Sequence, residues 1–295
     1  MSLMKKQRKS PRRIMKMIVI DGKKVALSVK ERVREEIAEN GYTPCLAVII
    51  VGNDPASETY VKNKQLACEF CGIKSMKYAL PEETSQEELI ALIQKLNDDY
   101  EVDGILCQLP LPKHIDKEAV IEAIDVEKDV DAFSLTNTGR IMIGNYSFLP
   151  CTPAGIMELL KYYNIETAGK NAVIVGRSNI VGKPMAMLLM QADATVTICH
   201  SKTQNLQEHC KNADILIAAV GVESFFKADM VKEGAVVIDV GINRSGNGRL
   251  YGDVDFDEVS KKASYITPVP GGVGPMTIAT LMQNTLTSYK NKISK

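Results

Sequence analysis

VIVGRSNIVGKP, residues 173–184, predicts a buried β-strand that runs into a glycine-bearing turn and then into a helix. Gly176 and Gly182 bracket the turn, and Pro184 fits the first turn of the helix, which continues through MAMLLM. The free backbone amides and the dipole of such a helix start attract anions, as they do in dinucleotide-binding domains. The spacing departs from G-x-G-x-x-G, and proline follows Lys183 where a P-loop has serine or threonine. A purely structural turn therefore stays open on this pattern alone.

Three further strand patterns follow this turn, and a helical pattern precedes it. The strands are TVTICH (195–200), ADILIAAVG (213–221) and AVVIDVG (235–241), and the helix is PAGIMELLKYYN (153–164). Four strands of this type make up half to most of a Rossmann-like domain. We place this domain at residues 151–274.

The first half of the chain also alternates strand and helix patterns. The strands are MIVID (17–21), CLAVIIVG (45–52), IKSMKYAL (73–80) and VDGILCQLP (102–110), and the helices are VALSVKERVREEIAEN (25–40), YVKNKQLACEFCG (60–72) and SQEELIALIQKLND (85–98). This alternation favours a parallel sheet covered by helices. The stretch 126–150 is rich in turn formers and lacks a helical period, so it is predicted to be a loop and connector.

The predicted fold class is therefore α/β, with two α/β domains that face each other across a cleft. A chain of 295 residues exceeds what one hydrophobic core usually serves. The first domain, for substrate and catalysis, takes residues 18–150 together with 275–295, because the last helix, TIATLMQNTLTSY (277–289), is expected to pack back on it. Residues 1–17 are strongly basic and are expected to form a disordered arm, most simply an extension upstream of the true start, with a targeting peptide or a phosphate-binding arm as alternatives.

Composition favours a small-molecule partner. Lysine plus arginine equals aspartate plus glutamate at 36 each, so no global field draws the protein to nucleic acid or to a membrane surface. No apolar run approaches the length of a membrane span. Seven scattered cysteines indicate reduced thiols in the cytoplasm. The lone Cys68-x-x-Cys71 and the dispersed histidines, His114, His200 and His209, predict no metal site.

Tyr60 and Lys64 lie four residues apart, one turn along a predicted helix, in the segment YVKNK. Carbonyl reductases with Tyr-x-x-x-Lys on a single Rossmann domain carry the pair after the glycine turn, whereas here it comes before. This order indicates a separate substrate domain, although an exposed helix face with no function stays open. Gln108 ends a predicted strand in CQLPLP. Asp129 and Asp131 are either solvated loop carboxylates or groups that bind the nitrogen edge of a heterocycle.

The end of the second Rossmann-like strand indicates which dinucleotide binds. NAD-specific domains usually carry an acidic residue there, for the ribose hydroxyls, but this chain has His200, Ser201 and Lys202. Arg177, directly after the first glycine, offers a guanidinium whose geometry matches a ribose phosphate. The sequence therefore predicts NADP rather than NAD.

Taken together, the motifs resemble the bifunctional methylenetetrahydrofolate dehydrogenase/methenyltetrahydrofolate cyclohydrolase family, over nearly everything from Ile18 to Ser288. The matching blocks are VGNDPASETYVKNK (51–64), GILCQLPLP (104–112), EKDVDAF (127–133), PCTPAGI (150–156), VIVGRSNIVGKPM (173–185), CHSKT (199–203), VIDVGIN (237–243) and TPVPGGVGPMT (267–277). One departure is Ala132, since the family usually has glycine after VD.

The resemblance implies a role for individual residues. Lys64 would be the catalytic lysine, Tyr60 its partner and a surface on which folate stacks, and Gln108 a group that tunes the lysine. The implied substrate contacts are Tyr60, Leu109, Asp131, Pro270 and Gly274, and the implied cofactor contacts are Gly176, Arg177, Ser178, Ser201 and Ile242.

The resemblance also implies the reactions: NADP-dependent oxidation of 5,10-methylenetetrahydrofolate, then hydrolysis of the methenyl product to 10-formyltetrahydrofolate. It implies a homodimer with a place in one-carbon metabolism and purine biosynthesis. Three alternatives stay open: an NADP-linked oxidoreductase of another small substrate, a catalytically silent sensor of NADP or folate, and nucleic-acid binding through the basic arm.

Overall fold

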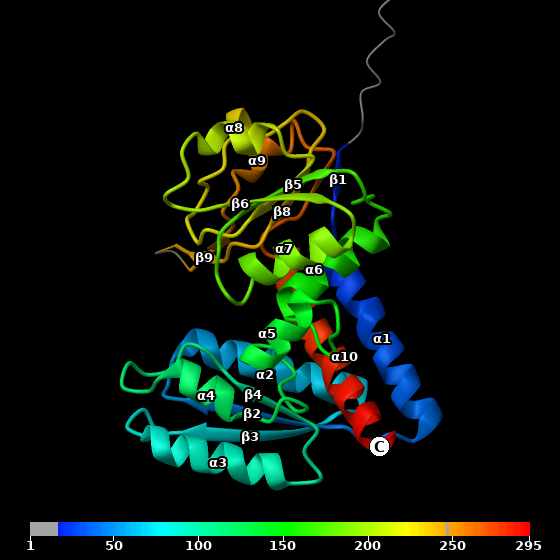
Figure 1. Cartoon of the computed structure of the whole chain (residues 1–295), viewed down its shortest axis with the longest axis vertical. Coiled ribbons are helices and arrows are strands. Elements are labelled where there is room, and N and C mark those ends of the chain that lie inside the picture. Colours follow the sequence, from blue (N-terminus) through cyan, green and yellow to red (C-terminus); the bar gives the residue numbers. More distant parts are fainter. Residues whose placement is uncertain (1–16, 246–247) are drawn as a thin grey trace, which may run out of the picture.

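The computed structural model describes residues 17–245 and 248–295, and these residues form two α/β bodies (Figure 1). The upper body in Figure 1 is built on a six-stranded sheet and the lower body on a three-stranded sheet. Two long helices, α1 (Gly22–Asn40) and α10 (Val273–Ile293), run side by side from one body to the other. The predicted two-domain α/β class is confirmed.

The six-stranded sheet is parallel throughout, in the order β1-β11-β8-β7-β5-β6. Its strands are β1 (Ile18–Val19), β5 (Asn171–Val175), β6 (Thr195–Cys199), β7 (Ile215–Ala218), β8 (Val236–Asp239) and β11 (Tyr265–Ile266). The strand order reverses between β5 and β7, because the chain runs from β5 outward to β6 and then returns to β7 on the other side. In open α/β sheets, ligands bind beyond the carboxyl ends of strands at such a point.

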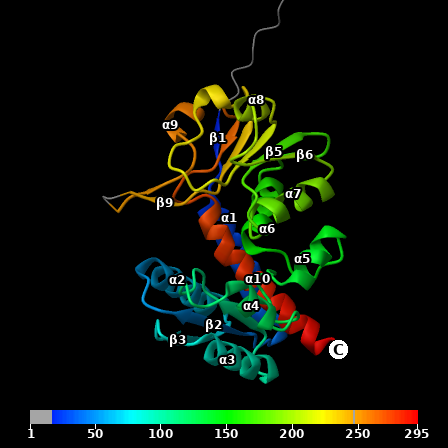
Figure 2. The ribbon, with the colours of Figure 1, turned by 60° about the vertical axis from the view of Figure 1, so that its left-hand side comes forward.

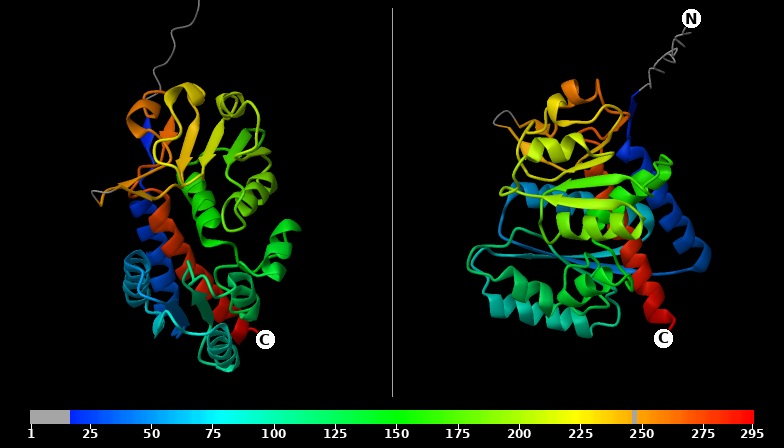
Figure 3. Two further views of the ribbon diagram at one scale, coloured as in Figure 1. Left: turned by 90° about the vertical axis from the view of Figure 1, so that its left-hand side faces the viewer. Right: turned by 45° about the horizontal axis from the view of Figure 1, so that its top comes forward.

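Alternate residues of the central strands pack on opposite faces of this sheet. Ile174 on β5 and Ile217 on β7 belong to one buried cluster, which includes residues of α6 (Cys151–Tyr162) and α7 (Gly182–Gln191). Val175 and Leu216 belong to the cluster on the other face, against residues of α8 (Leu206–Lys211) and α9 (Phe256–Val259). Helices therefore cover both faces, as parallel sheets require. Figures 2 and 3 show this layering from three further directions.

The three-stranded sheet is also parallel, in the order β3-β2-β4. The central strand β2 (Cys45–Val51) is buried along its whole length, between β3 (Lys74–Leu80) and β4 (Gly104–Cys107). Helix α2 (Pro55–Cys71) lies on one face, and α3 (Gln86–Asp98) and α4 (Lys117–Ala123) lie on the other. The described residues also form η1 (Ala228–Met230), the antiparallel pair β9 (Asn243–Arg244) and β10 (Leu250–Tyr251), and a further helix, α5 (Leu135–Met142).

Helices α1 and α10 each contribute to both hydrophobic cores. Val29 of α1 and Met276 of α10 lie in the cluster under the six-stranded sheet. Farther along the same helices, Val33 and Leu281 lie in the cluster under the three-stranded sheet. The two bodies are therefore joined by continuous helices as well as by connecting loops.

The strand predicted at MIVID forms, but it lies in the other sheet. Ile18 and Val19 pair with Tyr265 and Ile266 at the edge of the six-stranded sheet, so the first-domain sheet has three strands rather than four. Short edge strands carry little pattern, and their partner is set by where α1 must begin. The proposed domain boundaries of 18–150 plus 275–295 and 151–274 remain a prediction, and the basic arm lies, except for Met17, outside the described residues.

A helix lies where the sequence predicted only a loop. Helix α5 (Leu135–Met142) begins at Ser134, whose side chain accepts a hydrogen bond from the amide of Asn137. Its buried residues are only Asn137 and Ile141, while Leu135 is 75% exposed. Eight residues with a polar buried position and an exposed leucine give no apolar period, so the prediction for 126–150 was wrong at this point.

Candidate active site

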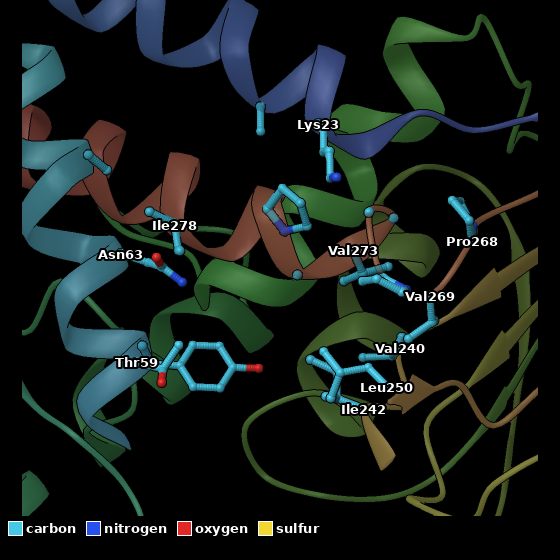
Figure 4. A pocket seen from close by; sticks show the side chains of 18 of the residues that line it. Lys23, Thr59, Asn63, Val240, Ile242, Leu250, Pro268, Val269, Val273 and Ile278 are labelled. Carbon is cyan, nitrogen blue, oxygen red and sulfur yellow. The ribbon is translucent and has the colours of Figure 1, made fainter. Parts of the chain in front are cut away.

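A cavity of about 780 Å³ lies where the two bodies meet (Figure 4). Its walls come from α1, α2, the segment after β8, the β9–β10 pair and the loop that leads into α10. In Figure 4, Thr59 and Asn63 extend from α2 on one side, and Ile242 and Leu250 face them from the other. Lys23 points toward the cavity from α1. The predicted cleft between two domains is therefore present.

Lys64 and Gln108 form a hydrogen-bonded pair; neither lines this cavity, although Tyr60 and Asn63, on the same helix as Lys64, do. The Lys64 Nζ atom donates to Gln108 Oε1 at 2.9 Å, and Gln108 Nε2 donates to the carbonyl of Leu109 at 2.6 Å. Lys64 is 8% exposed, on the α2 turn after Tyr60. Gln108 follows β4, and its amide continues the sheet ladder to Ile49. A rigid strand end therefore aims the glutamine at the lysine.

The charge of Lys64 is held between opposing influences. Burial lowers its pKa, whereas the nearby Asp131 carboxylate raises it. Burial raises the pKa of Asp131, and Lys64 opposes that rise. The Cys151 thiol donates to Asp131 Oδ1 at 3.5 Å. Lys64 and Asp131 are therefore a poorly solvated amine and carboxyl pair, each of which favours the charged form of the other.

The two aspartates of EKDVDAF have different roles. Asp129 is 2% exposed, and its carboxylate accepts the amides of Phe133 and Ser134 and the side-chain amide of Asn137. It therefore fixes the turn that leads into α5. Asp131 instead interacts with Lys64 and remains partly exposed.

Ala132, between the start of this turn and Phe133, has a left-handed backbone with φ of 56° and is 1% exposed. Left-handed backbone is uncommon for any residue with a side chain. The conformation explains why glycine suits this position in the resembling family.

Tyr60, Pro270, Gly274 and Ile242 are brought together as lining of the cavity. Burial raises the pKa of the Tyr60 hydroxyl, and the positive charge of Arg244, which also lines the cavity, opposes that rise. The δ-methyl group of Ile242 would lie 3.9 Å from a Cβ at Gly274, so a side chain added there would be in van der Waals contact with Ile242. Leu109 is not part of this lining and instead borders a shallow hollow formed by residues 109–118.

The turn after β5 has no room for a side chain at either of its glycines, because neighbouring backbone atoms lie too close. A Cβ at Gly176 would lie 2.2 Å from the carbonyl oxygen of Ala219, and one at Gly182 would lie 2.2 Å from the carbonyl oxygen of Gly176. Gly176 also has φ of 135°, which side chains rarely adopt. Ser178 Oγ accepts the amides of Val181 and Gly182 at the start of α7. These features fit a turn that lets a phosphate group approach the backbone closely.

The remaining predicted cofactor residues surround this turn. The amide of Gly176 donates to the carbonyl of Cys199, so the ends of β5 and β6 lie side by side. Arg177, Ser178 and Ser201 are all exposed at this edge. Lys202, also exposed, is next to Ser201, and the segment after β6 contains no acidic residue before Glu208. The residues present therefore fit a dinucleotide that carries a ribose phosphate.

Several polar residues at the site were missed by sequence reasoning. The Cys151 thiol donates a hydrogen bond to Asp131. Asn284 of α10 donates to the carbonyls of Val130, which precedes Asp131, and of Leu149, two residues before Cys151. Asp239, the last residue of β8, and Asp253, whose amide donates to the Asp239 carboxylate, are also buried. Their partners are mostly distant in the chain, so no local spacing identifies them. Cys151 stands in the PCTPAGI block, which was its only visible signal.

Within the part of the chain that the structure describes, neither a metal site nor a membrane-spanning helix is found. Across residues 17–245 and 248–295, no three histidine, cysteine, aspartate or glutamate side chains gather as a metal site. Among the helices within those ranges, none has both the length and the apolar character needed to cross a bilayer.

Comparison with known proteins finds a match for each half of the chain. Residues 20–131 match the model of the tetrahydrofolate dehydrogenase/cyclohydrolase catalytic domain, and residues 150–293 match that of the NAD(P)-binding domain of the same family. The bifunctional protein FolD of Campylobacter hominis is 60% identical over 282 residues, which cover 95% of this chain and 99% of that protein.

Solved structures show the same similarity in three dimensions. The bifunctional enzyme FolD of Campylobacter jejuni, a methylenetetrahydrofolate dehydrogenase/cyclohydrolase, superposes with a TM-score of 0.91 at 55% identity, over 93% of this chain and 99% of that one. The Trypanosoma brucei dehydrogenase-cyclohydrolase, solved with NADP and an inhibitor, gives a TM-score of 0.91 at 40% identity, over 95% and 99%. The chain belongs to the tetrahydrofolate dehydrogenase/cyclohydrolase family.

Proposed function

We propose that this protein oxidises 5,10-methylenetetrahydrofolate to 5,10-methenyltetrahydrofolate with NADP, and then hydrolyses the methenyl product to 10-formyltetrahydrofolate. The observation that carries this proposal is the hydrogen bond of buried Lys64 to Gln108, on the helix α2 that also walls the cavity between the two bodies. Family membership supports the same pair of reactions.

The first reaction requires positioning more than acid–base chemistry. NADP, when bound, supplies the acceptor for a hydride, and the folate nitrogens stabilise the cation that remains. The residues around Gly176, Arg177 and Ser201 hold the cofactor, while Tyr60 offers a flat surface on the opposite side of the cavity. Holding the two reacting groups at near-attack distance is the main contribution of the protein in this step.

The second reaction adds water to the methenyl carbon, opens one carbon–nitrogen bond and releases a proton. A lysine can move that proton if its pKa is lowered, and burial lowers the pKa of Lys64. Gln108 fixes the position of the Lys64 amine by its hydrogen bond. Asp131, whose carboxylate favours the charge of the amine and is partly exposed, would bind the nitrogen edge of the pterin ring. Pro270 and Gly274, which line the cavity, would contact the substrate, while the predicted contact of Leu109 needs the substrate to extend beyond the cavity lining.

Replacement of the catalytic lysine tests the proposal. Lys64→Met should lower cyclohydrolase turnover about 100-fold or more, because a general acid–base group is lost. It should lower dehydrogenase turnover less and leave NADP binding unchanged. Methenyl formation and methenyl decay would be followed separately.

Lys62→Met is the matched control, since Lys62 lies on the exposed face of the same helix. Cyclohydrolase turnover near the wild-type rate in Lys64→Met would refute the assigned role. NADP binding by the wild type without any folate turnover would favour a sensor instead.

The proposal extends to a homodimer in the cytoplasm. β6 is an edge strand of the six-stranded sheet, and Ile198 on it and Met190 on the adjacent α7 are 38% and 47% exposed. An exposed edge strand with apolar neighbours suits pairing with a second copy. The seven cysteines are all free, which suits a reducing compartment. There the 10-formyl product would serve as a one-carbon donor, including for purine biosynthesis.

A further inference from the structure

Asp253 is a buried carboxylate whose hydrogen bonds join two separate parts of the site. It has no exposed surface. Its Oδ2 atom accepts the amides of Val220 at 2.6 Å and Gly221 at 3.0 Å, and its Oδ1 atom accepts the amide of Val222 at 2.9 Å. The side-chain amide of Asn243 also donates to Oδ1, at 3.0 Å. Four donors, three of them consecutive backbone amides, therefore compensate for the burial of this charge.

Asp239, the last residue of β8, holds the segment that carries Asp253. Its Oδ1 atom accepts the amides of Gly241 at 3.0 Å and Asp253 at 2.9 Å, and its Oδ2 atom accepts the amide of Val254 at 2.9 Å. Burial raises the pKa of Asp239 to about 6, and the charge of Asp253 adds to that rise. The two carboxylates thus form one connected unit between β8 and the segment after β10.

Two glycines show how tightly this unit is packed. A Cβ at Gly241 would lie 2.1 Å from Asp253 Oδ1, and a Cβ at Gly252 would lie 1.8 Å from Asp239 Oδ2. Neither position has room for a side chain without displacing a carboxylate. The hydrogen bonds of both aspartates are therefore fixed by contact with the backbone.

The donors of Asp253 come from opposite parts of the site. Val220, Gly221 and Val222 follow β7, and their neighbour Ala219 is in contact with the Gly176 turn. These residues lie at the carboxyl end of the sheet, where a dinucleotide binds. Asn243 lies between Ile242 and Arg244, which both line the cavity, and Ile242 faces α2 across it (Figure 4).

We propose that Asp253, oriented by Asp239, is a positioning residue for hydride transfer, because it fixes the cavity wall at residues 241–244 relative to the cofactor-binding edge at residues 220–222. This inference rests on the proposed function. Asp253 touches neither substrate nor cofactor in this role. It sets the separation between the surfaces that hold them, and displacements of about 1 Å can reduce turnover about 100-fold.

Asp253 should matter for the dehydrogenase and much less for the cyclohydrolase. The cyclohydrolase groups Lys64, Gln108 and Asp131 stand on the other body, where Asp253 makes no hydrogen bond among the described residues. Loss of Asp253 should therefore reduce the dehydrogenase far more than the cyclohydrolase. A purely structural role would reduce both in proportion to the folded protein that remains.

Two substitutions of different severity test this. Asp253→Asn keeps the shape but leaves backbone donors facing an amide group, and dehydrogenase kcat should fall about 100-fold. Asn243→Ala removes only the link to the cavity wall and leaves the three backbone donors in place, so it keeps the fold and should lower dehydrogenase kcat about tenfold. In both variants, KM for folate should change less than kcat. Cyclohydrolase, assayed from added methenyltetrahydrofolate, should fall no more than about threefold.

Asp214→Asn is the matched control. Asp214 also accepts a backbone amide, from Asn171, but at the amino end of the same sheet, and it should leave the ratio of the two activities unchanged. Equal loss of both activities in Asn243→Ala, or wild-type dehydrogenase kcat in both site variants, would overturn the inference while the proposed function stands. A wild type without folate turnover would overturn the proposed function, and the inference with it.

Discussion

The protonation equilibrium of Lys64 is set by two opposing influences, burial and the Asp131 carboxylate. Its amine lies almost out of water, where a positive charge is costly, yet Asp131 nearby favours that charge. The Gln108 carbonyl oxygen accepts a hydrogen bond from the amine and fixes its position. The proposed hydrolytic step therefore depends on the fraction of Lys64 whose amine is neutral.

This balance predicts how cyclohydrolase turnover depends on pH. Burial lowers the pKa of Lys64 from the ordinary 10.5, so the neutral amine is populated at lower pH than for an exposed lysine. Cyclohydrolase kcat should rise with pH to a plateau whose midpoint lies below 10.5. In Asp131→Asn the carboxylate that raises this pKa is gone, and the midpoint of the residual activity should move lower still. A midpoint that moves up in Asp131→Asn would contradict the assignment.

Ala132 predicts a gain of stability on substitution. Its left-handed backbone costs a side chain on the order of 1 kcal/mol, which glycine avoids. Ala132→Gly should therefore raise the free energy of unfolding by up to about 1 kcal/mol, measured by urea denaturation. Ala154→Gly, on the regular helix α6, should lower it by about 0.5–1 kcal/mol. A loss of stability in both variants would show that the buried methyl group of Ala132 matters more than its backbone.

At the scale of elements, the strand–turn–helix unit from β5 to α7 predicts cofactor preference. Arg177 is exposed at this turn beside Ser201, where a ribose phosphate would lie. Arg177→Ala should raise KM for NADP about 10- to 100-fold, because charge-assisted hydrogen bonds are lost, and should leave KM for NAD nearly unchanged. Steady-state kinetics with both cofactors would measure this.

Lys183→Ala is the comparison for that measurement. Its Nζ atom donates to Asn179 within the same turn, at 2.6 Å. Any effect of this variant should fall equally on NADP and NAD. Equal effects of Arg177→Ala on the two cofactors would mean that another group selects the phosphate.

Elements with a strong local pattern were predictable, and those defined by distant partners were not. The fully buried β2 and the glycine turn after β5 carry their pattern in consecutive residues, and both were predicted from the sequence. The helix α5 was missed because its buried positions are one asparagine and one isoleucine. β1 was assigned to the wrong sheet because two residues cannot specify a partner that lies more than two hundred residues away.

The same distinction applies to the site. Lys64 lies on a predicted helix, Gln108 ends a predicted strand and Asp131 lies in a predicted loop with a recognisable motif. The structure brings them together. Asp253 was not predicted, because three of its four donors lie 31–33 residues earlier along the chain and its acidic side chain predicts exposure. Burial with four donors is a property of the assembled fold.

At the scale of the whole molecule, the shared helices predict that the two bodies lose stability together. Leu286 of α10 is fully buried in the core under the three-stranded sheet. Leu286→Ala should lower the free energy of unfolding by about 2–4 kcal/mol. Because α10 continues into the other core, hydrogen exchange should quicken in β5 as well as in β2. Leu135→Ala, on the exposed face of α5, should change neither, and faster exchange in β2 alone would contradict this coupling.

The route of α10 also sets an order of events during synthesis. β2 emerges from the ribosome early, but Leu281, Met282 and Leu286, which cover one face of its sheet, emerge more than two hundred residues later. At typical elongation rates this interval is on the order of tens of seconds. During that interval the face of the three-stranded sheet that α10 covers in the folded protein remains exposed to solvent. A newly made chain of this protein should therefore be captured by chaperones on the ribosome until its last helix is free.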